Sequence, residues 1–275
     1  MKQNFPLLKI VPLSRVVLHE EVEHRRVRKL ALRIERDGFV KNPIIAAELN
    51  GRKLYVILDG ANRQGALRRL GIEDIPVQII DYKSPEVELH SWNHLLKGIQ
   101  QDELLKKLSQ IKGLKLKNSS LSEAEEEISR GVTAGYLNFN NTVILSLKGE
   151  GGIPHHMLIK NVFDAYRKDA EIKRFYSEPG NRLFSNLSEG SIAVVFRKFS
   201  KGEILYLAEN GIKLPAGVTR HIIPGRVVQL NLKLSLLKSE DSLEERNEAL
   251  QNYIEDLLKE GRIRFYNEPV FCFNE

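Results

Sequence analysis

Residues 56–63, with the sequence VILDGANR, combine a carboxylate, a glycine and a guanidinium at the expected junction of a buried strand and a helix. Unpaired backbone N–H groups at a helix start, together with the helix dipole, attract anions and most often phosphate. Gly60 would let the backbone approach such a ligand, and Arg63 could bind two of its oxygens. The pattern therefore predicts a phosphate site. In the alternative interpretation, Asp59 only caps the helix and Arg63 lies in solvent.

A second candidate is Glu20, within the sequence VLHEEVEH that follows the first expected strand. A carboxylate at a strand end, close to an anion site, can accept a hydroxyl proton while phosphate oxygens are held nearby. This placement indicates a general base. The alternative is a solvated acidic loop that leads into a helix.

A third candidate lies late in the chain, in the sequence LPAGVTRH of residues 214–221. Thr219, Arg220 and His221 offer a hydroxyl, a fork of donors and an imidazole in one short span. This combination suits a carboxylate or a phosphate. The alternative is a plain loop between two strands.

Trp92 is the single tryptophan, and it lies in the sequence HSWNH. A lone tryptophan is commonly a core anchor whose N–H needs a partner. His90 and His94, four residues apart, and the neighbours His155 and His156 could each bind a metal ion. Neither pair has a third ligand nearby, so the sequence predicts no metal site there.

The elements that must position these residues begin with an alternating α/β unit over residues 1–82. Apolar spacing predicts a helix over 24–37 that ends at Gly38, and a second helix over 61–70. Strand-like segments flank Asn50 and Gly51, a strong hairpin signal. The expected strands cover residues 8–18, with a proline break, and residues 43–47, 53–58 and 75–80.

Beyond a joint at residues 83–85, the pattern predicts a second domain of α+β class over residues 83–275. Residues 121–130 should form a helix capped by Ser120 or Ser122. The other expected helices cover residues 89–116, 157–175 and 243–259, and the other expected strands lie within 132–147, 191–196 and 227–232.

Composition narrows the function classes further. The 275 residues, 42% of them hydrophobic, suffice for one large domain or two small ones. No apolar run approaches the roughly 20 residues that span a bilayer, and the N-terminus lacks a signal-peptide pattern, which indicates a cytoplasmic protein without membrane contact. Cys272 is the single cysteine, so disulfides within the chain and cysteine-based zinc sites are excluded. The net charge of +6 favours anionic partners.

Residues 8–82 resemble the ParB/sulfiredoxin fold, whose phosphate-binding signature is a strand, a Gly-x-His-Arg motif or a relative of it, and a helix. Over nearly the whole chain, the order and spacing of several motifs are similar to those of free L-serine kinases built on this fold, including those of siderophore biosynthesis. The motifs are Leu18-His19-Glu20, Asn42-Pro43-Ile44, Asp59-Gly60 with Arg63, Ser91-Trp92-Asn93-His94, and residues 215–220 followed by Gly225-Arg226.

The resemblance implies an N-terminal ParB/sulfiredoxin-like domain with a mixed sheet, and a kinase that converts free L-serine to O-phospho-L-serine with ATP or ADP and Mg²⁺. It makes Glu20 the base and places Asp59 in the catalytic site and near the metal. The donor phosphates would be held by Gly60, Ala61, Asn62 and Arg63. The serine pocket would consist of Trp92, Thr219, Arg220 and His221, with Arg220 on the carboxylate and His221 beside it.

One position departs from the resemblance, because Asn62 stands where these proteins usually have histidine. Asparagine can donate one hydrogen bond to a phosphate but carries no charge. Either the activity is reduced, or the histidine is not essential to phosphoryl transfer.

A ParB-like, nucleotide-dependent DNA-binding regulator is the alternative, and the basic composition would allow it. The best candidate for a helix-turn-helix is residues 104–116, whose pattern is poor, so DNA is not the favoured partner. The basic residues of the helix over 24–37 also fit a solvated helix face. Sulfiredoxin chemistry is excluded, since Ala61 stands where the reactive cysteine would be.

Overall fold

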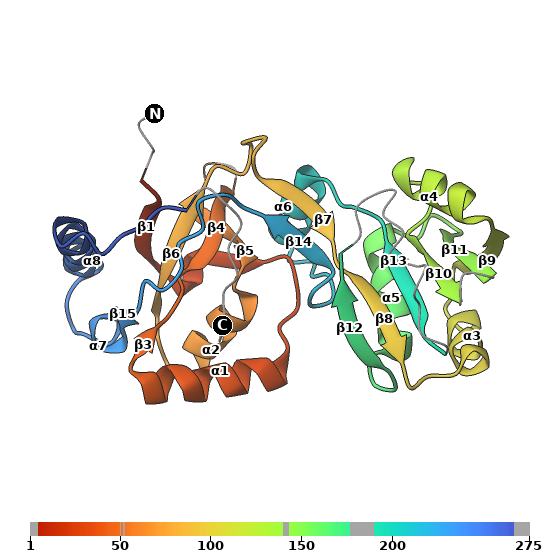
Figure 1. Ribbon diagram of the computed structural model, residues 1–275, viewed down its shortest axis with the longest axis horizontal. Helices are drawn as coiled ribbons and strands as arrows, with labels where there is room; N and C mark the ends of the chain where they lie inside the picture. The colour runs from red at the N-terminus through yellow and green to blue at the C-terminus, as the bar shows by residue number, and fades with distance from the viewer. Residues whose placement is uncertain (1–4, 50, 52, 140–142, 177–189, 267–275) are drawn as a thin grey trace. The chain divides into compact units, whose positions relative to one another are not determined.

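The computed structural model describes residues 5–49, 51, 53–139, 143–176 and 190–266, and the chain divides into two compact units (Figure 1). Unit 1 combines Met1–Val17, Val22–Val87 and Ile223–Glu275. Unit 2 combines Leu18–Glu21 with Glu88–Ile222. The expected domains 1–82 and 83–275 stay a prediction, but the compact units are interleaved in the sequence.

Unit 1 is built on a mixed five-stranded sheet in the order β1-β6-β4-β5-β2. Strand β4 pairs with β6 in parallel and with β5 in antiparallel register, and β1 pairs with β6 in antiparallel register. The expected mixed sheet is therefore confirmed, as is the hairpin around Gly51, although Asn50 lies outside the described residues. The strands are β1 (Leu7–Pro12), β2 (Val16–Leu18), β4 (Ile44–Leu49), β5 (Leu54–Asp59) and β6 (Asp74–Ile80), with a 3-10 turn at Leu13–Arg15.

Two helices of unit 1, α1 (His24–Asp37) and α2 (Ala61–Arg69), form where the sequence predicts them. Helix α1 buries the face with Val27, Ala31 and Ile34, while its basic residues are exposed. This exposure fits the interpretation as a solvated helix face. The two helices contact each other at Gly65, where an added Cβ would lie 2.9 Å from a methyl group of Val27.

The C-terminal segment completes unit 1 with the short strand pair β3 (Phe39–Val40) and β15 (Leu232–Lys233), and with α7 (Leu234–Leu237) and α8 (Leu243–Lys259). The strand expected over 227–232 is wrong, because Gln229 and Asn231 have φ values of 56° and 49°, which interrupt an extended chain. Helix α8 lies against β1, the edge of the sheet. The amide of Asn247 accepts from the N–H of Ile10 and donates to its carbonyl, both at 2.9 Å.

Unit 2 is built on an antiparallel six-stranded sheet in the order β12-β8-β13-β10-β11-β9. A separate antiparallel pair joins β7 (Glu88–Ser91) to β14 (Thr219–Ile222). The sheet strands are β8 (Asn93–Lys97), β9 (Leu114–Ser119), β10 (Gly135–Phe139), β11 (Val143–Gly149), β12 (Glu171–Phe175) and β13 (Ile192–Phe196).

The helices of unit 2 depart more from expectation. They are α3 (Gln101–Ser109), α4 (Leu121–Ser129), α5 (His155–Tyr166) and α6 (Lys201–Glu209). Ser120 caps α4 as predicted.

The helix expected over 89–116 is wrong, since the chain forms β7, β8, α3 and β9 there. The helix expected over 157–175 ends at Tyr166, and β12 follows. The change from α3 to β9 also shows that residues 104–116 contain no helix-turn-helix. No helix in the described ranges is long and apolar enough to cross a membrane.

Candidate active site

The predicted phosphate site of unit 1 lies where β5 ends at Asp59 and α2 begins at Ala61. Gly60 occupies the N-cap position with a φ of 102°, and no side chain caps the helix. Arg63 turns back toward Asp59, and its Nη2 donates to Oδ2 across 3.2 Å. The Arg63 side chain is only 22% exposed. The alternative, in which Asp59 caps the helix and Arg63 lies in solvent, is therefore wrong.

The geometry around Gly60 fits an anion. A Cβ at this position would lie 2.9 Å from Arg63 Nη2, and side chains rarely adopt this φ, so the close approach requires glycine. The Nε of Arg63 is buried and has no hydrogen-bond partner among the described residues. A buried donor without an acceptor, beside the open amides of a helix start, suits phosphate oxygens.

Arg226 adds a second guanidinium to Asp59, with Nη1 lying 3.1 Å from Oδ2. Burial raises the pKa of Asp59, but the charges of Arg63 and Arg226 and hydrogen bonds from Arg63 and Gly60 outweigh it, so the pKa is lowered. Asp59 is thus an ionised partner of two arginines and a poor proton acceptor. Gly225-Arg226 is one of the motifs that carry the resemblance, but no role for Arg226 follows from the sequence.

Asn62 joins the first turn of α2 to the start of α1. Its Oδ1 accepts from the backbone N–H of Glu23 across 2.8 Å. Glu23 is the N-cap residue of α1, and its own side chain makes no capping bond. Asn62 therefore binds the backbone at the start of α1, and only its amide nitrogen stays available to a ligand.

In unit 2, Glu20 follows β2 and forms a bridge with Leu214. Its carboxylate is held by the chain at residues 217–219. Oε2 accepts from the N–H of Gly217 at 3.0 Å, and Oε1 accepts from the N–H groups of Val218 at 3.2 Å and Thr219 at 2.6 Å. The hydroxyl of Thr219 adds a fourth bond to Oε1 at 2.6 Å. Glu20 is therefore a fixed carboxylate and not part of a solvated acidic loop, and Oε2 retains capacity for a further donor.

His19 stands behind this arrangement, with Nε2 lying 2.9 Å from Thr219 Oγ1. The single hydroxyl proton goes to Glu20, so His19 must donate from Nε2. His221 contacts the His19 ring edge-on, at 5.4 Å between ring centroids. Alternation along β14 directs His221 and Arg220 to opposite faces, so the structure places His221 with His19 and Thr219 instead of beside Arg220.

Arg220 lies between two aromatic rings. Its Cζ is 4.6 Å from the centroid of Trp92 and 4.3 Å from that of Tyr176. Such stacking stabilises a cation and fixes the plane of its fork. The guanidinium makes no hydrogen bond within the described part of the chain, so its donors are available to a carboxylate. Trp92, at the junction of β7 and β8, therefore serves as a wall of this site.

Tyr176 was missed from the sequence. Its hydroxyl lies 3.3 Å from Nδ1 of His90, whose Nε2 is 2.6 Å from a Glu88 carboxylate oxygen. Tyr176 falls just after the end of a segment expected to be helical, and it carries no motif that would have revealed it.

Across the described ranges, no group of three or more His, Cys, Asp or Glu side chains could hold a metal ion. His90 and His94 lie in separate strands and bond to different partners, and Cys272 lies outside the described residues. Magnesium, which keeps several waters and commonly binds through substrate phosphates, would fit here only together with a nucleotide.

Comparison with known proteins gives the site its context. No protein-family model matches the chain. The chain is 28% identical over 272 residues to the ATP-dependent L-serine kinase SbnI of Staphylococcus aureus, covering 98% of this chain and 97% of SbnI. It is 26% identical over 242 residues to the ADP-dependent L-serine kinase SerK of Thermococcus kodakarensis, covering 86% and 97%. The chain is thus similar to two L-serine kinases over most of its length.

Solved structures show a similar fold. A C-terminally truncated SbnI from Staphylococcus aureus superposes with a TM-score of 0.77 at 25% identity, covering 91% of this chain and 97% of that one. A free serine kinase in complex with AMP has a TM-score of 0.72 at 22% identity, covering 86% and 98%. The fold expected from the resemblance is therefore confirmed.

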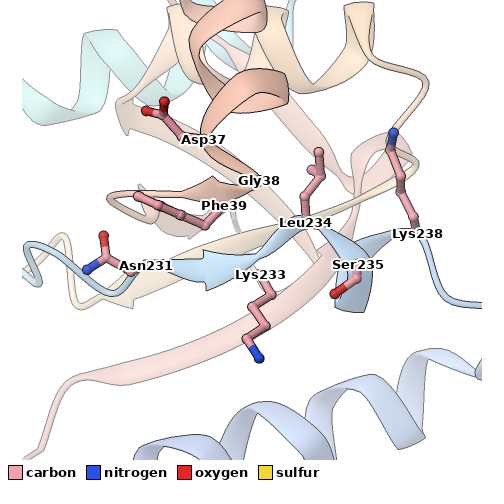
Figure 2. Close-up of a pocket in the computed structure, with 8 residues that line it drawn as sticks. All are labelled: Asp37, Gly38, Phe39, Asn231, Lys233, Leu234, Ser235 and Lys238. Atoms are coloured by element: carbon pink, nitrogen blue, oxygen red, sulfur yellow. The ribbon is translucent and has the colours of Figure 1, made fainter.

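The chain also has a pocket of about 510 Å³ in unit 1, where α1 ends and β15 and α7 begin (Figure 2). Figure 2 shows no predicted site residue among those that line it. The predicted phosphate site consists instead of Asp59, Arg63 and Arg226 in unit 1. The predicted carboxylate site consists of Arg220 and its two aromatic neighbours in unit 2.

Proposed function

We propose that this chain is a free L-serine kinase that transfers a phosphoryl group from ATP or ADP to the serine hydroxyl, giving O-phospho-L-serine. The observation that carries the proposal is the fixed carboxylate of Glu20. Four donors orient it, and Oε2 has a lone pair left for a hydroxyl proton. Phosphoryl transfer depends mostly on positioning and charge neutralisation, and an oriented base fits that requirement.

Unit 1 supplies the donor-binding residues. The amides at the start of α2 and the guanidinium groups of Arg63 and Arg226 would bind the nucleotide phosphates, and Gly60 keeps the backbone accessible. Phosphate oxygens would satisfy the buried Nε of Arg63. Magnesium bound with the phosphates would neutralise part of their charge, and Asp59 is the carboxylate beside this site.

Unit 2 supplies the acceptor-binding residues. Arg220, held between Trp92 and Tyr176, would pair with the serine carboxylate through its fork. Glu20 would accept the hydroxyl proton at Oε2, while Thr219 keeps the carboxylate in place. His221 would support Thr219 through His19. The cytoplasm, where free serine and nucleotides occur, is the compartment we propose.

The direct test incubates the purified protein with L-serine, magnesium and either ATP or ADP, and measures phosphoserine by ³¹P NMR. Product with at least one donor is expected, and folded protein that gives none with either donor would refute the proposal. Glu20→Gln should lose turnover and retain nucleotide binding. The matched control is Glu21→Gln, since Glu21 is adjacent but ion-paired with Lys160 and Arg167. Equal turnover of the two variants would remove Glu20 from the mechanism.

A nucleotide-dependent DNA-binding regulator is the second candidate, and the net charge of +6 is the observation in its favour. The region expected to hold a helix-turn-helix contains α3 followed by β9. Gel shifts at increasing salt distinguish the candidates. Tight, sequence-specific binding would favour a regulator, whereas weak binding that moderate salt abolishes would reflect charge alone.

A further inference from the structure

Three consecutive peptide groups hold the Glu20 carboxylate, and each is bound on its carbonyl side as well. The first joins Ala216 to Gly217. Its N–H donates to Glu20 Oε2 at 3.0 Å, and its carbonyl accepts from Nη2 of Arg174 at 2.9 Å.

The second peptide group joins Gly217 to Val218. Its N–H donates to Glu20 Oε1 at 3.2 Å, and its carbonyl lies 3.4 Å from Nε2 of His94. The third joins Val218 to Thr219, with its N–H on Oε1 at 2.6 Å and its carbonyl accepting from the backbone N–H of Trp92 at 2.8 Å. Each of the three peptide groups therefore has a partner at its N–H and another at its carbonyl.

A peptide group is planar, and its N–H and C=O point in opposite directions. A donor on the carbonyl therefore fixes the direction of the N–H at the other side of the group. It also polarises that N–H, because linked hydrogen bonds strengthen one another in a low-dielectric interior. The three donors behind the loop thus determine where the Glu20 carboxylate is held.

His94 is itself fixed from behind by a buried tyrosine. Its ring is fully buried, and Nδ1 lies 2.7 Å from the hydroxyl of Tyr166, which is also fully buried. Burial lowers the pKa of His94 to about 4, so the ring is neutral and has one donor and one acceptor. Since Nε2 faces the carbonyl of Gly217, it carries the proton, and Nδ1 accepts from Tyr166.

Arg174 packs closely on the same loop. A Cβ at Gly217 would lie 2.2 Å from Arg174 Cζ, and Gly217 has a φ of 73°, so this contact requires glycine. The glycine thus lets the guanidinium reach the carbonyl of Ala216.

We infer that Arg174 and the Tyr166–His94 pair are positioning residues for Glu20, acting through the carbonyl groups of Ala216 and Gly217. The hydrogen bonds that Glu20 accepts come from residues 217–219, so these three side chains act on it through the loop. Their effect on catalysis rests on the proposed function, whereas their effect on the loop does not. Each should influence a different amide, because Arg174 binds the peptide group that ends at Gly217 and His94 binds the one that ends at Val218.

The first test measures amide hydrogen exchange at Gly217 and Val218 by NMR, which requires no activity. Arg174→Met keeps the chain length without the donors, and it should speed exchange about tenfold, chiefly at Gly217. His94→Leu should do the same, chiefly at Val218, and His94→Gln, whose amide can donate, should partly restore protection. Glu20→Ala provides the reference for amides that have lost the carboxylate.

The second test uses Tyr166→Phe, which removes only the hydroxyl behind His94. Its matched control is Tyr136→Phe, a buried tyrosine of unit 2 that packs with Ala124 and Ile144. Tyr166→Phe should lower kcat about tenfold and leave the KM for nucleotide unchanged, because the base is misplaced while donor binding is intact. The control should retain wild-type kcat.

The outcomes separate the two proposals. Wild-type exchange at both amides in folded Arg174→Met and His94→Leu would overturn the positioning role, whatever the activity. Residue-specific exchange changes in a protein that makes no phosphoserine would support the positioning role and overturn the kinase. Equal loss of protection at every amide of the loop in each variant would also contradict the inference, since it would indicate general loosening.

Discussion

Replacement of His94 by glutamine should remove a defined part of the pH dependence of stability. Burial lowers the pKa of His94 from 6.5 to about 4; the hydrogen bond to the Gly217 carbonyl opposes this shift, and the charge of Arg174 adds to it. Between these two values the unfolded chain binds a proton that the folded chain does not, so the stability present above pH 6.5 is lost as the pH falls through 4.

The size of the effect follows from the two pKa values. At 1.36 kcal/mol per pKa unit, the full loss approaches about 3 kcal/mol. Between pH 7 and pH 5, where the folded histidine is still neutral, the expected loss in the free energy of unfolding is about 2 kcal/mol. His155 and His156 have lowered pKa values as well, and they contribute to the slope in both proteins.

Urea denaturation at pH 7 and pH 5, followed by the fluorescence of Trp92, measures this loss. Trp92 is the single tryptophan and lies in unit 2 with His94, so its signal reports that unit. The wild type should lose about 2 kcal/mol more than His94→Gln between the two pH values. The same pH dependence in both proteins would refute the argument that a buried, neutral His94 supports this fold.

Three further predictions concern the binding sites. Gly60→Ala should weaken nucleotide binding at least tenfold, because the new Cβ would lie 2.9 Å from Arg63 Nη2; calorimetry with ADP measures the change. Asn62→Asp should keep the bond from the Glu23 N–H and hence the stability, while the added charge raises the KM for nucleotide about fivefold, since like charges 4 Å apart in water repel by about 1 kcal/mol. Tyr176→Ala should raise the KM for serine roughly tenfold through loss of the cation–π contact, whereas Tyr176→Phe should resemble the wild type in steady-state kinetics.

Each of these predictions has a control within the chain. Gly38→Ala introduces the same left-handed strain, but its new Cβ has no other atom within 4 Å. Equal nucleotide affinity of the two glycine variants would therefore contradict a phosphate site at Gly60. Asn62→Ala should lose stability that Asn62→Asp retains, and the reverse order would disprove the link to α1. Tyr206→Ala alters an exposed tyrosine on α6, and a matching rise in its KM for serine would remove Tyr176 from the pocket.

Sequence patterns predicted the elements that local signals determine. Helix α1 has an apolar stripe and a glycine stop, and α8 begins with a Ser242–Glu245 capping box. Residues 89–116 were misassigned because their polar side chains bond across strands, as Ser91 does to the carbonyl of Arg197 and Asn93 to the N–H of Phe196. Helix α6 went unpredicted although it also has a capping box, at Ser200 and Glu203.

The candidate site likewise contains residues that the sequence indicated and residues that it did not. Residue types and the family resemblance indicated Glu20, the phosphate motif and Arg220, since each lies in a short contiguous pattern. The supporting residues could not be found from such patterns. Tyr176 contacts Arg220 although the two residues are 44 positions apart in the sequence. Arg174 likewise binds the carbonyl of Ala216, which is 42 positions away. Only the folded chain brings them together, and their residue types alone indicate no partner.

The contact between Asn247 and Ile10 has a consequence for the growing chain. The two residues are separated by 237 positions, and the amide of Asn247 closes the outer side of β1, where strand edges invite pairing with other chains. Translation adds about 5–20 residues per second, so Asn247 is synthesised roughly 10–50 s after the strand β1 that it covers. Throughout that interval the outer side of β1 is open to pairing with a strand of another chain.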